Sequence, residues 1–206
     1  MKPRSLLIAT LNRGKLQELR QLVEKLPFVI SDLGGLPCLK PIPETGETFI
    51  ENASLKAAGY ATQTGFLTLA DDSGLEVAHL NGAPGVFSAR YAHEGASDAD
   101  RTNKLLAELS HVPESGRAAR FVSVIAIADE YGAIINVSTG ACDGRIANAP
   151  RGTNGFGYDP VFIPKGFDRT FAELESEVKN RISHRAQAVA AAVEFLHSLT
   201  THEDAG

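Results

Sequence analysis

Residues 67–75 read Leu-Thr-Leu-Ala-Asp-Asp-Ser-Gly-Leu, an apolar run that ends in two adjacent carboxylates and a Gly-containing segment. Together with Phe66, the apolar run is typical of a buried β-strand, and Ser73-Gly74 predicts a turn that ends it. Successive side chains on a strand point to opposite faces, so Asp71 and Asp72 can share one task only if the chain turns between them. Two carboxylates at the carboxyl end of a strand suit a divalent cation such as Mg²⁺. Taken alone, the stretch is better explained as a polar turn that merely ends a strand, so the rest of the chain has to decide.

The composition is that of an ordinary globular protein. With 206 residues, 43% of them hydrophobic and 22% charged, the chain can form a full core, and we expect one domain, 1–206, with 201–206 as a flexible tail. The formal net charge of −5 argues against nucleic acid as a partner. Cys38 and Cys142 lack the spacing of a zinc site or a disulfide framework. The first apolar run is too short for a signal peptide or a membrane span, so we expect a cytoplasmic protein with no membrane partner.

The order of expected strands and helices indicates an α/β protein. An apolar run at 5–9 predicts a strand, apolar residues at helical spacing between 16 and 26 predict a helix, and Thr48 with Glu51 has the pattern of a capping box for a second helix. Further on we expect a helix at 97–109, an antiparallel hairpin of strands 121–128 and 134–139, a short helix opening at 170–173 and a last helix capped by Ser183. Strands that alternate with helices and are then followed by a hairpin predict a mixed sheet.

The segment Thr10 to Lys15 has the character of a phosphate-binding turn. It breaks the first strand, contains Gly14, and leads into a helix whose first amides and dipole favour an anion. Lys15 adds a charge, and Thr10 and Asn12 add hydrogen-bonding groups. The spacing of a Walker P-loop is absent, and an ordinary strand-to-helix turn explains the same residues equally well.

Three further segments carry candidate binding residues. Glu44 precedes the capped helix and becomes a metal ligand if that helix start faces Asp72; otherwise it is an exposed acidic residue that favours the helix dipole. Residues 152–160, Gly-Thr-Asn-Gly-Phe-Gly-Tyr-Asp-Pro, put glycines around Phe156, which lets a flat ligand approach the backbone and stack on the ring. His184 and Arg185 lie in the first turn of the last helix, where two cations oppose the dipole unless a ligand compensates.

These segments, in this order, resemble the family of inosine/xanthosine triphosphate pyrophosphatases, which act on non-standard purine nucleoside triphosphates. The resemblance covers nearly the whole chain, and its specificity lies in the ordered set rather than in any single motif. Leu11 departs from the small or polar residue usual at its position, although its backbone amide can still donate. The matching segments are 9–15, 44–46, 51–53, 70–75, 82–85, 88–91, 155–160 and 183–185.

The resemblance implies both a fold and a reaction. The implied fold is an elongated mixed β-sheet flanked by helices, with two lobes and a central nucleotide cleft. The implied reaction is Mg²⁺-dependent hydrolysis of ITP, dITP or XTP to the nucleoside monophosphate and pyrophosphate by a homodimer, which would remove such nucleotides from the cellular pool.

The resemblance also implies tasks for the matched residues. Asp72 is the implied general base that orients the attacking water, and Glu44 and Asp72, together with Asp71 as a further candidate, are the expected Mg²⁺ ligands. The sequence alone does not show whether Asp72 is the general base, a metal ligand or both. The implied substrate-binding residues are Thr10, Leu11, Asn12, Arg13, Gly14, Lys15, Ser73, Phe156, Gly157, Tyr158, Asp159, Lys179, His184 and Arg185.

Specificity for the base follows from the polarity of hydrogen bonds. Hypoxanthine and xanthine carry an acceptor oxygen at C6, where adenine carries an amino donor. A donor from Lys179, His184 or Arg185 aimed at that position would bind the oxygen of hypoxanthine or xanthine. With adenine, it would meet the amino group, so that two donors would lie opposite each other without an acceptor.

Three other functions fit parts of the same pattern. A pyrophosphatase for modified pyrimidine nucleotides would share the architecture but not the segments 155–159 and 183–185. A nucleotide sensor without turnover would not need Glu44, Asp71, Asp72 and Lys15 together. A Mg²⁺ phosphatase with an aspartyl nucleophile would release orthophosphate, but its Asp-x-Asp spacing is not that of Asp71-Asp72.

Overall fold

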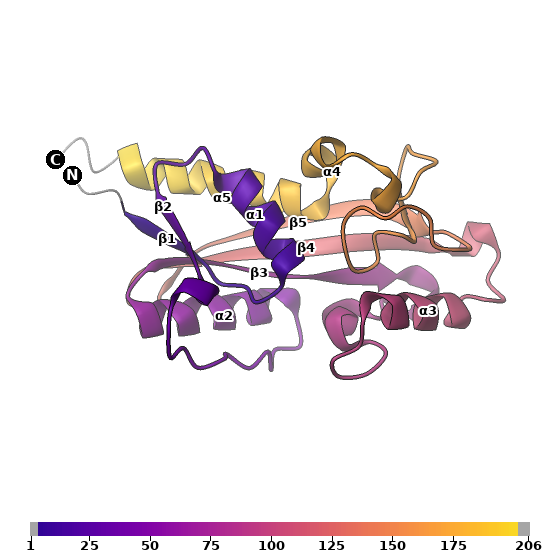
Figure 1. The fold of residues 1–206 in the computed structure, drawn as a ribbon, viewed down its shortest axis with the longest axis horizontal. Coiled ribbons are helices and arrows are strands. Elements are labelled where there is room, and N and C mark those ends of the chain that lie inside the picture. The colour runs from indigo at the N-terminus through magenta and orange to yellow at the C-terminus, as the bar shows by residue number, and fades with distance from the viewer. Residues whose placement is uncertain (1–3, 202–206) are drawn as a thin grey trace. The chain divides into compact units, whose positions relative to one another are not determined.

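A computed structural model describes residues 4–201 of the chain, and Figure 1 shows their strands and helices. The strands are β1 (Ser5–Ile8), β2 (Val29–Asp32), β3 (Leu67–Val77), β4 (Ala118–Ala128), β5 (Ile134–Ile146) and β6 (Phe162–Pro164). The helices are α1 (Arg13–Val23), α2 (Phe49–Thr64), α3 (Asp98–Glu108), α4 (Ser176–Ile182) and α5 (His184–Thr201). The strands form one sheet in the order β2-β1-β3-β4-β5-β6, in which β1 is parallel to β2 and β3, and β6 is antiparallel to β5. The predicted mixed α/β sheet is confirmed.

The described chain divides into two compact units. The first comprises residues 4–72, 123–140 and 185–201, and the second comprises residues 73–122 and 141–184. Two of the four boundaries of the second unit fall at predicted functional segments, between Asp72 and Ser73 and between His184 and Arg185. The single domain expected from the sequence stays a prediction, and its tail lies outside the described residues apart from Thr201.

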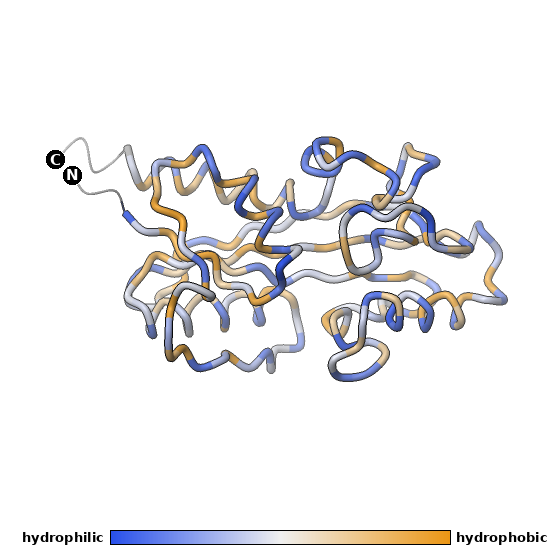
Figure 2. Tube along the Cα trace, in the orientation of Figure 1, coloured by the Kyte–Doolittle hydropathy of each residue, from blue (hydrophilic) through white to orange (hydrophobic). Residues whose placement is uncertain are grey.

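The first unit has helices on both faces of its strands. Helices α1 and α5 cover one face and α2 covers the other (Figure 1). Hydrophobic and hydrophilic residues alternate along α1 and α5, as expected for helices with one buried side (Figure 2). On the α1 and α5 face, Leu67 and Leu69 of β3 join a fully apolar cluster with Leu19, Val189 and their neighbours. Asp71 continues this alternate series toward the same face.

Strand β3 continues through the segment where we predicted a turn. It runs from Leu67 to Val77 without interruption, so the prediction that Ser73-Gly74 ends the strand is wrong. The physical reason is that Asp71 and Asp72 each have cationic partners within the fold, which stabilise them inside a strand. Because no turn intervenes, the two carboxylates point to opposite faces of the sheet.

The second unit is built around the remaining parts of β3, β4 and β5. Its core joins Leu75 and Val77 of β3 to Leu105 of α3 and to a group of aromatic rings that includes Phe121, Phe162 and Phe171. The ring centroids of Phe121 and Phe162 lie 4.6 Å apart in an edge-to-face arrangement. Tyr158 of the segment 155–159 belongs to the same core.

The local predictions for helices hold to different degrees. The capping box of α2 is present, with reciprocal bonds between Thr48 and Glu51, and α3 begins with a second box from Ser97 to Asp100. The hairpin of β4 and β5 is confirmed but its strands are longer than predicted. The short helix expected to open at 170–173 is one 3-10 turn, Phe171–Glu173, which α4 follows, and β6 was not predicted. No helix within residues 4–201 combines the length and hydrophobicity needed to span a membrane.

Substitution of two leucines tests the assignment of the hydrophobic core in the first unit. Leu69 is completely buried, whereas Leu11 is 73% exposed. We expect Leu69→Ala to lower the free energy of unfolding by about 2–5 kcal/mol, because it leaves a cavity, and Leu11→Ala to change it by less than about 0.5 kcal/mol. Urea unfolding of the two variants measures both values. Equal effects would contradict the assignment of the core.

Candidate active site

The loop after β1 is closed by short-range hydrogen bonds. The Thr10 hydroxyl oxygen accepts from the Asn12 amide at 3.2 Å, and Oδ1 of Asn12 accepts from the Lys15 amide at 3.0 Å. Asn12 is therefore the N-cap of α1, and Gly14 and Lys15 lie in the first helical turn. The amides that start a helix have no intrahelical acceptor and favour a bound anion. The strand, loop and helix start predicted for phosphate binding are thus formed.

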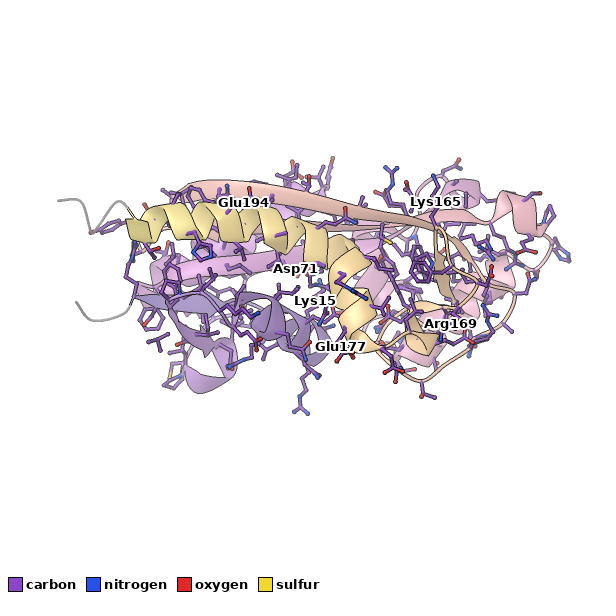
Figure 3. All side chains as sticks on the ribbon, turned by 90° about the horizontal axis from the view of Figure 1, so that it is seen from above. Lys15, Asp71, Lys165, Arg169, Glu177 and Glu194 are labelled. Carbon is purple, nitrogen blue, oxygen red and sulfur yellow. The ribbon has the colours of Figure 1, made fainter. Side chains whose placement is uncertain are left out.

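Asp71 lies at the centre of a buried charge network on the α1 and α5 face. Its Oδ2 is 2.8 Å from Nζ of Lys15, and its Oδ1 accepts from Ser123 Oγ at 2.6 Å and lies 3.5 Å from Nε of Arg185. The Arg185 guanidinium also donates to Glu18 of α1. The side chains of Lys15 and Asp71 are labelled in Figure 3. Two cations and two carboxylates thus balance one another within the first unit.

Asp72 belongs to a different network, which involves α2. Its Oδ1 accepts from Nζ of Lys56 at 2.8 Å, and the same ammonium group donates to Oε1 of Glu44 at 2.9 Å. Lys56 and Asp72 are buried, and Glu44 is half-buried. The predicted proximity of Glu44 to Asp72 is therefore present, and a lysine that the sequence analysis did not identify joins them.

The two neighbouring carboxylates have opposite pKa shifts. Burial acts to raise the pKa of Asp71, but the charges of Lys15 and Arg185 outweigh it and hold that pKa well below its usual range. Burial raises the pKa of Asp72 above its ordinary value, against the opposing charges of Lys56 and Lys15. Asp71 is thus a permanently ionised partner of cations, whereas Asp72 is the better suited of the two to accept a proton.

The donor set around Lys56 fits a divalent cation. One oxygen of Glu44 and one of Asp72 contact the same group, the Lys56 ammonium, which occupies the position where a divalent metal ion would be bound. Mg²⁺ is commonly bound by one or two carboxylates, with waters and substrate phosphates as the other ligands. Within residues 4–201, no three His, Cys, Asp or Glu side chains gather closely enough to hold a metal by themselves. Asp71 as a third ligand stays a prediction, and its contacts with Lys15 and Ser123 give it no support.

In the second unit, the segment 155–159 is folded around the carboxylate of Asp159. This carboxylate accepts from the Phe156 amide at 2.9 Å and pairs with Lys179, and both charged side chains are almost fully buried. A Cβ atom on Gly155 would lie 2.0 Å from Oδ2 of Asp159, so only glycine fits at that position. Nζ of Lys179 lies 5.0 Å from the centroid of the Phe156 ring. The structure thus brings together Phe156, Asp159 and Lys179, three of the residues predicted to bind substrate.

The other predicted residues have more varied surroundings. The His184 ring stacks on Phe121 with centroids 4.6 Å apart and an interplanar angle of 9°. Gly157 donates its amide to Asp98 of α3 at 2.6 Å. Tyr158 is 4% exposed and donates to the Ser88 carbonyl oxygen, which places it in the core of the second unit. Ser73 is a half-buried residue of β3, and Arg13 is exposed in the first turn of α1.

Sequence reasoning missed three residues of these networks: Glu18, Lys56 and Ser123. Lys56 carried a usable signal, because it follows Phe49 by seven residues and Ala53 by three and so lies on the apolar stripe of α2. A lone lysine on such a stripe needs a carboxylate partner. Glu18 and Ser123 carried no comparable signal, because Glu is common in helices and a small Ser is compatible with a buried strand.

Comparison with known proteins gives a consistent result. The model of the Ham1 family matches residues 6–195. A dITP/XTP pyrophosphatase of Desulforamulus reducens is 46% identical over 199 residues, which cover 97% of this chain and 98% of the relative. A dITP/XTP pyrophosphatase of Mycobacterium tuberculosis is also 46% identical, with 95% of this chain and 97% of the relative covered.

Solved structures agree with the sequence relatives. A HAM1 protein from Coxiella burnetii superposes with a TM-score of 0.83 at 44% identity and covers 96% of this chain and 99% of its own. The Staphylococcus aureus Ham1 protein gives a TM-score of 0.83 at 38% identity, with 95% and 99% covered.

The opposite environments of the two aspartates predict opposite effects on stability. Asp71→Asn leaves two buried cations short of a counter-charge, so we expect the free energy of unfolding at pH 7 to fall by about 3 kcal/mol. Asp72→Asn removes a carboxylate whose burial is unfavourable and leaves Glu44 as the partner of Lys56, so we expect a change of less than about 1 kcal/mol. Urea unfolding of both variants checks the contrast, and the reverse order of stability would refute the separate networks.

Proposed function

Because the chain belongs to the Ham1 family, we propose that the protein hydrolyses the non-standard purine nucleoside triphosphates dITP, XTP and ITP to the nucleoside monophosphate and pyrophosphate. Relatives that match almost its full length carry the name dITP/XTP pyrophosphatase, which confirms the predicted enzyme class. The observation that carries the proposal is the convergence of Glu44 and Asp72 on one cation in the unit that also holds the loop of Thr10 to Lys15.

The divalent cation in this proposal is Mg²⁺, held by Glu44 and Asp72. When bound, it supplies positive charge to the phosphate oxygens at which negative charge develops. Lys56 lies between the two carboxylates and keeps them close together in its absence. Since an ammonium group has three donors, Lys56 can keep one carboxylate and turn toward a phosphate oxygen.

The triphosphate is held by the start of α1. The first-turn amides and Lys15 contact its oxygens, and the amino group of Asn12, whose oxygen is occupied by the helix cap, is a further donor. Asp72 orients a water molecule toward the α-phosphorus and takes its proton as the new bond to phosphorus forms. The bond from the α-phosphorus to the bridging oxygen breaks, and pyrophosphate leaves.

Arg185 has a different task in this proposal from the one suggested by the sequence. Its contacts with Glu18 and Asp71 make it a positioning residue of the first unit, which with Asp71 fixes the ammonium group of Lys15. As donors to the C6 oxygen of the base we propose Lys179 and His184, with Phe156 as the stacking surface.

The remaining features of the proposal rest on the family resemblance. We propose a homodimer, and several exposed apolar side chains of the first unit, among them Ile50, Leu55 and Val137, are available for a contact. The absence of nucleic acid and membrane partners and the cytoplasmic location stay predictions.

Product analysis tests the proposed reaction. We expect IMP and pyrophosphate from ITP in the presence of Mg²⁺, little product from ATP, and none from either nucleotide after removal of metal by a chelator. Orthophosphate as the first product would indicate the aspartyl-phosphatase reaction instead. Binding of ITP without turnover would indicate a sensor, and preference for a modified pyrimidine would indicate the related pyrophosphatase class.

Two substitutions separate base recognition from catalysis. His184→Phe keeps a ring to stack on Phe121 but removes the ring nitrogens, so we expect the ratio of kcat/KM for ITP to that for ATP to fall at least about tenfold. Arg185→Lys should lower kcat/KM for both nucleotides by the same factor. Should Arg185→Lys change the ratio instead, Arg185 would be a base-reading residue, as the sequence first suggested.

A further inference from the structure

The segment from Lys40 to Gly46, which carries Glu44, is fastened to α2 by two side-chain carboxamides. Gln63 accepts from the Lys40 amide at 2.8 Å and donates to the Lys40 carbonyl oxygen at 3.0 Å. Asn52 accepts from the Gly46 amide at 2.8 Å and donates to the Gly46 carbonyl oxygen at 3.3 Å. Each carboxamide thus pairs with both polar groups of one residue of the segment.

The contact at Gly46 is the tighter of the two. Asn52 is 1% exposed, whereas Gln63 is an exposed residue. A Cβ atom on Gly46 would lie 2.5 Å from Cβ of Glu51, so the backbone of the segment touches the helix directly at this point. Glu51 also accepts from the amides of Glu47 and Thr48, at 2.7 and 3.0 Å. The segment therefore enters α2 along one fixed path.

Glu44 lies two residues before this contact, and its own side chain is 35% exposed. A half-exposed carboxylate on an irregular segment has many accessible positions, and the loss of this freedom opposes metal binding. The fixed backbone at Gly46 limits those positions and keeps Glu44 within reach of Lys56 and Asp72. Asn52 and Lys56 are one helical turn apart on α2. The same helix therefore carries the carboxamide that binds Gly46 and the ammonium group that lies between the carboxylates of Glu44 and Asp72.

We propose that Asn52 is a positioning residue for Glu44 and that its carboxamide sets the affinity of the Glu44 and Asp72 pair for a divalent cation. The proposal rests on the metal site of the proposed function. Only a carboxamide supplies one acceptor and one donor with the spacing of a peptide group, since a carboxylate lacks the donor and alanine lacks both. Partners that orient a metal ligand change metal affinity by about 10- to 100-fold when they are removed.

Binding of Mn²⁺ in the absence of nucleotide tests the proposal without any measurement of turnover. The Kd is obtained by titration with the EPR signal of free Mn²⁺, and thermal unfolding confirms that each variant is folded. We expect Asn52→Ala to raise the Kd about 10-fold or more. Asn52→Ser, which retains a smaller polar group, serves if the alanine variant does not fold. As a second readout, raising the Mg²⁺ concentration should restore much of the kcat of Asn52→Ala.

Gln63→Ala is the matched control. It removes the same pair of hydrogen bonds from the same segment and the same helix, but Lys40 is four residues from Glu44 and the contact of Ile42 with Gly59 lies between them. We expect its Kd for Mn²⁺ to stay within about twofold of that of the parent protein, because the fixed point at Gly46 remains.

Glu44→Gln separates failure of the inference from failure of the proposed metal site. If Glu44→Gln weakens Mn²⁺ binding while folded Asn52→Ala does not, the positioning role of Asn52 is wrong and the metal site stands. If Glu44→Gln leaves the Kd unchanged, Glu44 is not a ligand, and both the metal assignment and the role of Asn52 are refuted. Equal weakening by Asn52→Ala and Gln63→Ala would also overturn the specific role of Asn52.

Discussion

The alternation of side chains along β3 is the constraint on which the rest of the first unit depends. Since the strand runs through Asp71 and Asp72 without a turn, the two neighbouring carboxylates point to opposite faces of the sheet and meet different helices. Asp71 faces the cations carried by α1 and α5, and Asp72 faces Lys56 of α2. Two adjacent residues thus separate an internal ion network from the site that we propose to bind metal and to accept a proton.

The network around Asp71 also connects the phosphate loop to the last helix. A buried ion pair contributes little net stability, because desolvation of the charges offsets their attraction, but removal of one member is unfavourable. The effect of this network is to fix the positions of the elements that it joins. Lys15 from α1, Arg185 from α5 and Ser123 from β4 meet at one carboxylate, so the loop that is proposed to bind phosphate has a fixed position relative to these elements of its own unit.

The sequence predicted the elements that local signals specify. The capping box of Thr48 and Glu51 has a short-range cause and is present, and the helix predicted from residue 16 is formed but begins earlier, at Arg13. The continuation of β3 was not predictable in this way, because Ser73-Gly74 has the composition of a turn and only the distant partners of Asp71 and Asp72 favour a strand. The same limit applies to Arg185, whose contact with Glu18 joins residues 167 positions apart. For the candidate site, the ordered motifs identified Glu44, Asp72 and Lys179, whereas Lys56 became evident only when its helix face was known.

A crystal structure with Mn²⁺ and a non-hydrolysable analogue of ITP tests the central claim most directly. The claim is that Asp72 and Asp71 have separate roles, the first with metal and the second with Lys15. The anomalous difference map should place Mn²⁺ about 2 Å from oxygens of Glu44 and Asp72, with Asp71 still paired to Lys15. Coordination of Mn²⁺ by Asp71, with Asp72 left outside its ligands, would contradict the account.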